Sequence, residues 1–187
     1  MTNFNKILPC TLRHEGFYSI HPDDPGGETF RGIARNRHPK WPGWKIIDRK
    51  RAYQKFPRNL RYDRKLKDLV YFFYKDNFWS KIQGDRIPSH MIAKELFDTA
   101  VNVSPPRAIK FMQRALNIFN REQDLFPDLK VDGIIGSKTL NAISVIKIED
   151  AKLIFWMNII QGCYYLKITE RNPAFEAFPR GWIKRLK

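Results

Sequence analysis

Apolar residues recur at helical spacing along most of this chain of 187 residues. Residues 3–14 predict a short helix that ends at Gly16, because their apolar positions repeat every three or four residues. Residues 17–35 break that pattern with two prolines and three glycines, which predict turns and a small β-hairpin. Residues 36–64 are basic and contain three prolines, so we expect irregular structure there.

Helices dominate the rest of the chain. Ser89 and Ser104 each precede an apolar stripe at helical spacing, and serine is a good cap for a helix N-terminus. The other expected elements are a helix over 66–79, a loop over 120–136, a short helix from Ser137 and a long apolar helix over 149–169. The pattern therefore predicts a mainly α architecture with a small β element near the N-terminus.

The charge is strongly positive and unevenly spread. The chain has 34 basic and 19 acidic residues, a net charge of +15 at pH 7, and residues 45–67 hold ten basic residues against two acidic ones. Such a field attracts a polyanion: nucleic acid, anionic lipid or bacterial cell wall. A well-solvated basic face is the alternative. No nucleic-acid-binding motif accompanies the charge, so we expect no nucleic-acid partner.

Cysteine, histidine and hydropathy patterns exclude several classes. Cys10 and Cys163 are too few for a disulfide framework, and the four histidines show no metal-ligand spacing, so we expect no metal and no cofactor. Polar residues interrupt the apolar stretch 151–168, which predicts a buried helix and no membrane span. Residues 1–12 lack the features of a signal peptide. We therefore expect a soluble protein synthesised in the cytoplasm.

Three residues form a candidate catalytic set. Glu15 lies at the end of the first helix, where a partly desolvated carboxyl retains its proton as a general acid requires. Asp24 follows in the turn-rich segment and Thr29 on the returning strand. Glycoside hydrolysis needs one protonated carboxyl and a second, ionised one. By the residues alone, solvated carboxylates in a plain turn are the alternative, and Asp23 rivals Asp24.

The same segment resembles the signature of glycoside hydrolase family 108, N-acetylmuramidases that include secretion-activator-like proteins and phage endolysins. The matching residues are Glu15-Gly16-Phe17-Tyr18, Pro22-Asp23-Asp24-Pro25-Gly26-Gly27-Glu28-Thr29 and Gly32-Ile33. The spacing of Glu15 and Asp24 also looks like the Glu/Asp/Thr triad of phage-type lysozymes. Two departures stand out: Phe17 replaces a glycine, and His21 replaces an aspartate, which leaves the substrate fit near Tyr18 open.

The resemblance continues downstream. The family's aromatic and Phe-Asp elements look like Tyr74-Lys75-Asp76-Asn77-Phe78-Trp79 and Phe97-Asp98-Thr99-Ala100-Val101-Asn102. Residues 107–116, 131–140 and 181–182 resemble its C-terminal peptidoglycan-binding-like segment. The resemblance implies a lysozyme-like α+β catalytic region over 1–103 and a helical peptidoglycan-binding-like region over 104–187, packed on it.

The resemblance implies an enzyme that cleaves the β-1,4 bond between N-acetylmuramic acid and N-acetylglucosamine, for lysis or remodelling of the wall. Glu15 would be the acid, Asp24 the second carboxylate, and Thr29 would help to place water. Tyr18, Asp98 and Asn102 would contact the substrate. A carboxylate separation of about 6.5–9.5 Å favours inversion and one of about 5 Å retention; the sequence does not choose.

Several alternatives stay open on the sequence. Glu95, Asp98 and Asn102 share one helix face, either a solvated face or a cleft wall. Four aromatic residues are either core residues or sugar contacts: Tyr18, Trp41, Trp44 and Trp79. The 131–139 junction between a loop and a helix is either a capping element or a contact with the wall. The same bond could be cut by a lytic transglycosylase, or the chain could be a non-catalytic basic module for cell wall or nucleic acid.

The expected partner is bacterial peptidoglycan. A protein made in the cytoplasm reaches the wall after lysis or export, and a holin or a dedicated membrane protein would provide the route. The sequence does not separate a phage endolysin from a bacterial secretion-associated muramidase, nor does it show a peptide-stem preference. We expect a monomer.

Overall fold

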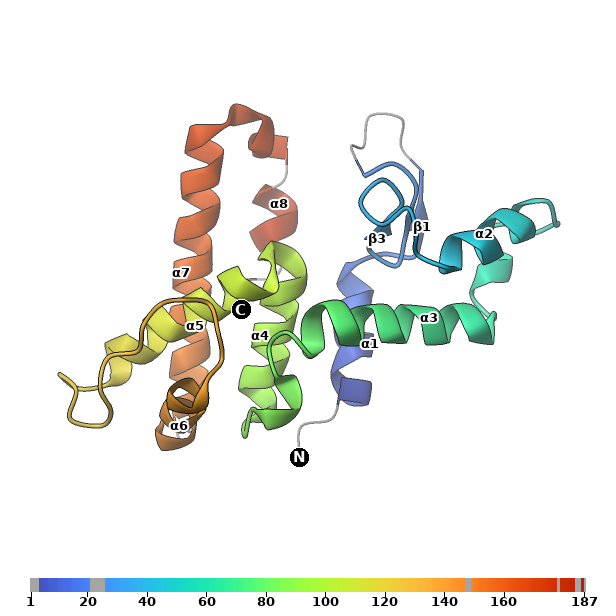
Figure 1. Ribbon diagram of the computed structural model, residues 1–187. Coiled ribbons are helices and arrows are strands. Elements are labelled where there is room, and N and C mark those ends of the chain that lie inside the picture. The colour runs from blue at the N-terminus through green and yellow to red at the C-terminus, as the bar shows by residue number, and fades with distance from the viewer. Residues whose placement is uncertain (1–3, 21–25, 147–148, 178, 184–185, 187) are drawn as a thin grey trace. The chain divides into compact units, whose positions relative to one another are not determined.

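The computed structural model describes residues 4–20, 26–146, 149–177, 179–183 and 186. Its contacts divide the chain into two compact units. The N-terminal unit comprises residues 5–77, and the C-terminal unit comprises Phe4 together with residues 78–187. The described residues are mostly helical, with a small sheet near the N-terminus (Figure 1). The predicted mainly α, lysozyme-like α+β fold class is therefore confirmed.

The N-terminal unit surrounds a three-stranded antiparallel sheet. Helix α1 (Phe4–His14) precedes strands β1 (Tyr18–Ser19), β2 (Thr29–Phe30) and β3 (Ile33–Ala34). Ser19 pairs with Thr29 and Tyr18 with Phe30, while β2 pairs with β3 through Phe30 and Ile33. The predicted hairpin is thus present and gains a third strand, because the chain turns again at Arg31 and Gly32, both with positive φ.

Helix α2 (Gly43–Arg51) lies within the stretch that we expected to be irregular, and that expectation is wrong there. Pro42 stands at its N-cap, where a missing N–H costs nothing because the first turn has no partner for it. Trp44, Ile46 and Ile47 are buried on one face, while lysine and arginine occupy the other. The prolines therefore position the helix start and do not exclude the helix.

The rest of this unit is helical. The 3-10 turn η1 (Arg58–Leu60) leads to α3 (Arg64–Tyr74), and the π-helical turn η2 (Lys75–Trp79) follows it. Asp63 caps α3 by accepting a hydrogen bond from the Leu66 amide (2.8 Å) and also pairs with Lys50 (2.9 Å). Together these contacts hold the start of α3 against α2.

The C-terminal unit is built on three packed helices: α4 (His90–Val103), α5 (Pro105–Phe119) and α7 (Asp150–Arg171). Figure 1 shows α7, in orange and red, alongside α4 and α5. The smaller elements are η3 (Gly84–Arg86), α6 (Ser137–Val145), η5 (Pro173–Ala177) and α8 (Pro179–Trp182). Ser89 caps α4 as predicted, by accepting a hydrogen bond from the Ile92 amide.

Polar groups help to join these helices. Thr99 of α4 donates a hydrogen bond to Gln161 of α7 (3.0 Å), and Tyr165 donates one to Asn102 (2.6 Å). Apolar side chains of α7 are not all buried: Phe155, Ile159 and Leu166 are exposed, so the helix is less enclosed than its composition indicated. Among the described residues, none of the helices is long and apolar enough to cross a membrane. Both cysteines are free thiols.

Candidate active site

Glu15 directly follows α1 and precedes the sheet. Gly16 takes a positive φ of 75°, a conformation that ends a helix and that glycine adopts without strain. The turn places the half-buried Glu15 side chain at the helix end. Its carboxyl group is therefore neither fully solvated nor sealed in the core.

Gly32 forms the wall against which the Glu15 side chain lies. A Cβ atom at Gly32 would sit 2.5 Å from Glu15 Oε2 and 2.5 Å from the Tyr74 hydroxyl oxygen, far inside contact distance. The Tyr74 hydroxyl donates a hydrogen bond to the Arg31 carbonyl (2.7 Å), which fixes the turn before Gly32. Because Gly32 has no side chain, the Glu15 carboxyl group and the Tyr74 hydroxyl group can both lie close to its backbone.

Thr29 lies on β2, opposite Ser19. Its hydroxyl is 3.4 Å from the Gly27 carbonyl, at the long limit of a hydrogen bond. The side chain is half-buried, so the hydroxyl can exchange this weak partner for another.

Asp24 and its rival Asp23 belong to the segment between β1 and β2, and both lie outside the described residues. The separation of the two carboxylates, and with it the stereochemical expectation, stays untested. In the described residues, Glu15, Gly32 and Tyr74 lie together, and Thr29 lies on strand β2 of the sheet, which ends just before Arg31 and Gly32.

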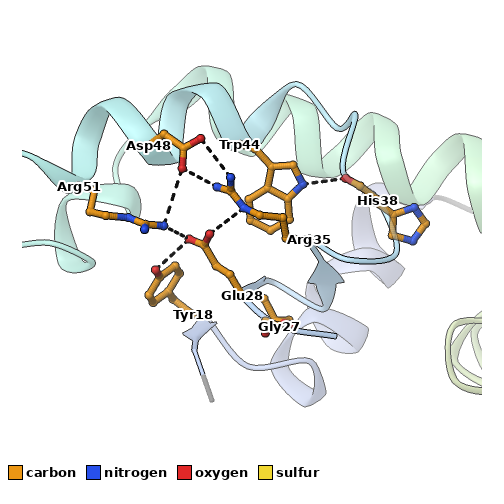
Figure 2. Close-up of polar contacts among 9 residues, drawn as sticks. Tyr18, Gly27, Glu28, Arg35, His38, Trp44, Asp48 and Arg51 are labelled. Carbon is orange, nitrogen blue, oxygen red and sulfur yellow. Dashed lines mark hydrogen bonds and ion pairs between the residues drawn. The ribbon is translucent and has the colours of Figure 1, made fainter. Parts of the chain in front are cut away.

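Glu28, which the sequence analysis did not single out, is the centre of an ion-pair cluster (Figure 2). Its side chain is 8% exposed and contacts two arginines: Arg51 Nη2 lies 2.7 Å from Oε1, and Arg35 Nε lies 2.8 Å from Oε2. Asp48 completes the cluster through a bidentate contact with Arg35 at 2.5 and 3.1 Å. The cluster links β2 to α2. In the sequence, Glu28 stands between Gly27 and Thr29 of the matching segment, and no other signal indicated its role.

Tyr18 takes part in the same cluster. Its hydroxyl donates a hydrogen bond to Glu28 Oε1 (2.9 Å), and its ring packs edge-on against Phe56 at 5.0 Å. Burial, together with the hydrogen bond to Glu28 and the charge of that carboxylate, raises the pKa of Tyr18 to about 12. This hydroxyl joins β1 to Glu28, which directly precedes β2, and contact of Tyr18 with substrate stays a prediction.

The tryptophans weighed as sugar platforms are core residues. Trp41, Trp44 and Trp79 are all buried. Trp41 and Trp44 pack edge-to-face at 5.1 Å, and Arg35 stacks over the Trp44 ring at 4.5 Å. Of the two alternatives, the core interpretation is the one that the structure supports.

On α4, Glu95 and Asp98 are buried and Asn102 is half-buried. A solvated polar face is therefore excluded for the first two. Asn102 accepts the hydrogen bond of Tyr165 through its side-chain carbonyl oxygen, so this oxygen takes part in holding α7. Contact of Asp98 and Asn102 with substrate stays a prediction.

Hydrogen bonds join the 131–139 junction to helix α5. Gln113 of α5 accepts a hydrogen bond from the Gly133 amide (2.9 Å) and donates to Asp132 (2.9 Å). One turn later, Asn117 makes two hydrogen bonds to the backbone of Leu129, both of 2.9 Å. The loop thus lies against one face of α5.

The fold and the Glu15 site define the class: a lysozyme-like α+β protein with a carboxyl group at the end of its first helix. The comparisons name the family. Residues 8–103 match the glycosyl hydrolase 108 model, and residues 107–187 match the model of a predicted peptidoglycan domain. The chain belongs to the glycosyl hydrolase 108 family. It is therefore a glycoside hydrolase of the muramidase type that acts on peptidoglycan.

A solved structure supports the same fold. SagA from Brucella abortus is similar with a TM-score of 0.62 and 25% sequence identity, over 98% of this chain and 88% of that chain. A comparison with curated proteins gives no match. The family matches meet between residues 103 and 107, whereas the compact units divide between Asn77 and Phe78, so the division into regions 1–103 and 104–187 stays a prediction.

Proposed function

We propose that this protein is an N-acetylmuramidase that hydrolyses the β-1,4 bond between N-acetylmuramic acid and N-acetylglucosamine. Glu15 donates a proton to the glycosidic oxygen as the bond breaks, and a water molecule adds to the anomeric carbon. Asp24 is the second carboxylate, and the Thr29 hydroxyl helps to place the water. The observation that supports this most strongly is the Glu15 carboxyl group held against Gly32.

Chemical requirements support this assignment of Glu15. A general acid has to be partly shielded from water and yet reach the substrate. Glu15 is half-buried, and its position is limited by the Gly32 backbone and the Tyr74 hydroxyl. Tyr74 is itself fully buried, so this wall of the site is rigid and the carboxyl need not be ordered when substrate binds.

Product analysis tests the reaction. Purified sacculi are digested and the released muropeptides are analysed by mass spectrometry. Hydrolysis adds the elements of water and leaves reducing N-acetylmuramic acid ends. A lytic transglycosylase instead joins a hydroxyl of the same sugar to the anomeric carbon as an internal acetal and leaves anhydro ends, which would contradict the proposal.

Zymography on the same sacculi tests the residues. We expect Glu15→Gln to remove the clearing zone and Asp24→Asn to reduce it strongly, while Asp23→Asn retains it. Asp68→Asn, an exposed acid of α3, is the matched control. Full lysis by Glu15→Gln would show that another acid is used, and a wild type that binds sacculi without clearing them would indicate a basic binding module. The reverse order for the two aspartates would reassign the second carboxylate to Asp23.

Peptidoglycan lies outside the cytoplasmic membrane, so the proposed activity requires passage of the protein. We propose synthesis in the cytoplasm and action on the wall after release or export, through a holin pore or a dedicated membrane protein. Fractionation of cells that produce the protein with and without a co-expressed holin tests the first route: wall-associated protein should depend on the holin.

A further inference from the structure

A cavity of about 280 Å³ opens in the N-terminal unit, and its lining includes neither Glu15 nor Thr29. Its floor is apolar and buried, and consists of Leu8, Phe30, Leu60 and Val70. Its rim carries four cations: Arg13, Arg31, Arg61 and Lys67. We call this cavity the Phe17 pocket, after the aromatic ring at its rim.

The cations gather without acids. Among the described residues, no acidic, hydroxyl or amide side chain lines the Phe17 pocket, and none of the ion pairs within that part of the chain involves its four cations. Arg13 donates to the Cys10 sulfur, which is a weak acceptor. A sugar or a peptide would find few matching groups here, because both need acceptors as well as donors.

Two of the guanidinium groups share one ring. Arg31 lies 4.9 Å and Arg61 5.4 Å from the centroid of Phe17. Burial, and then the charge of Arg61, lower the pKa of Arg31 from its usual value; both side chains nevertheless stay charged at neutral pH. Arg31 is half-buried and Arg61 is exposed beside it, and an anion between two neighbouring guanidinium groups would stabilise both.

The backbone also places Arg31 specifically. Its φ of 51° is in the left-handed region, which arginine adopts with strain, and the Tyr74 hydrogen bond to its carbonyl holds it there. Phe17, the ring beneath both arginines, stands where the family signature has glycine. The arrangement therefore depends on a residue that departs from that signature.

We propose that the Phe17 pocket binds an anionic lipid, with a phosphate group held by Arg31 and Arg61 and the first methylene groups of the lipid chain on the apolar floor. Guanidinium groups match phosphate oxygens in a forked geometry, and the floor offers the apolar contact that hydrated polyanions do not need. Anionic leaflets attract basic proteins by charge alone; the pocket adds selectivity for a phosphate joined to hydrocarbon.

Calorimetric titration with three probes tests this proposal: dodecyl phosphate below its micellar concentration, inorganic phosphate, and dodecyl maltoside. We expect measurable binding of dodecyl phosphate, and binding at least about tenfold weaker for the other two. If inorganic phosphate bound equally well, the apolar floor would have no role in binding and the lipid proposal would be overturned. If the maltoside bound equally well, the arginines would have no role, and this too would overturn the proposal.

Variants then locate the site. Combining Arg31→Asn, which tolerates a positive φ, with Arg61→Gln should weaken dodecyl phosphate binding about tenfold, and Phe17→Gly should weaken it without any change of charge. Lys45→Gln combined with Lys65→Gln removes the same charge from exposed positions of this unit outside the pocket and should bind as the wild type does. Equal losses in both pairs would show that net charge alone is responsible and would overturn the proposal.

Vesicle co-sedimentation extends the test to membranes. At equal salt, vesicles of phosphatidylcholine containing phosphatidylglycerol should bind more of the wild type than of the Arg31→Asn/Arg61→Gln double variant. The Lys45→Gln/Lys65→Gln double variant should bind as the wild type does. Because neither readout uses wall cleavage, failure here leaves the muramidase proposal intact, and a catalytically inactive Glu15→Gln protein should still bind the lipid.

Discussion

The carboxyl group of Glu15 and the hydroxyl group of Tyr74 lie on the same side of Gly32, each within 2.5 Å of the place where a Cβ atom would stand. Glu15 directly follows the first helix and Tyr74 ends α3, so the 58 residues between them have to fold before the two meet. The glycine between them has a φ of 79°. Three residues from three elements therefore define one wall of the proposed site.

Gly32→Ala tests this wall. A methyl group would overlap two oxygen atoms at a positive φ, so we expect a loss of about 1–3 kcal/mol in the free energy of unfolding and at least a tenfold loss of lytic rate. Chemical denaturation and turbidity loss of sacculi measure the two effects. Gly136→Ala is the control, because nothing lies within 4 Å of its added Cβ; equal effects at both glycines would contradict the role given to Gly32.

Removing the Glu28 charge should loosen the joint between β2 and α2. Glu28→Gln leaves Arg35 and Arg51 without their shared carboxylate, but both arginines are partly exposed, so water compensates in part. We expect a loss of about 1–3 kcal/mol in the free energy of unfolding. Thermal unfolding measures it, with the exposed Asp68→Asn as control. An unchanged Tm would mean that the cluster contributes no net stability.

The raised pKa of Tyr18 predicts a pH dependence. The folded state holds this proton up to a pKa of about 12 and the unfolded state loses it near 10.0, so the stability that it contributes is present below pH 10 and is lost as pH rises toward 12. Urea unfolding between pH 9 and 12 measures the slope. Tyr18→Phe should flatten it, whereas Tyr62→Phe, at a residue that is 80% exposed, should not. Coincident curves for wild type and Tyr18→Phe would refute the linkage.

Gln113 and Asn117 should hold the 128–136 loop. Gln113→Ala leaves the buried Gly133 amide without its acceptor, which costs about 1–3 kcal/mol. Hydrogen exchange at Gly133 should accelerate, and the pKa of Asp132, lowered first by the Gln113 hydrogen bond and then by the Ile134 amide, should rise. NMR reports both. Arg114→Ala, exposed on the same helix, should change neither.

Salt should separate binding to the wall from chemistry. The net charge of +15 attracts the anionic wall, and salt screens this attraction. We expect increasing salt to slow turnover of intact sacculi more than turnover of small soluble fragments. Initial rates on the two substrates across a salt series provide the comparison, and equal slowing of both would count against a role of the charge in wall binding.

Much of the architecture was predictable because it depends on local signals. Apolar periodicity, Ser89 and Ser104 indicated the starts of α4 and α5; Ser89 caps its helix through its side chain, whereas Ser104 stands at the N-cap of α5 without a capping hydrogen bond from its side chain. Helix α2 was missed because its prolines lie next to a short apolar face, and burial of Trp44 against other aromatic rings is a tertiary event. Likewise, the sequence left a solvated face of α4 open beside a cleft wall, and burial excluded the solvated face for Glu95 and Asp98, because polarity alone does not show what covers a helix.

For this protein the sequence alone determined the helix pattern, the small β element, the family motifs and Glu15 as the candidate acid, since these depend on residue type and spacing along the chain. Only the tertiary structure decided that Gly32 and Tyr74 enclose Glu15, that Glu28 binds two arginines, and that Arg31 and Arg61 share the Phe17 ring. Each of those contacts joins residues from separate elements, and such proximity arises from packing, which one-dimensional periodicity does not encode.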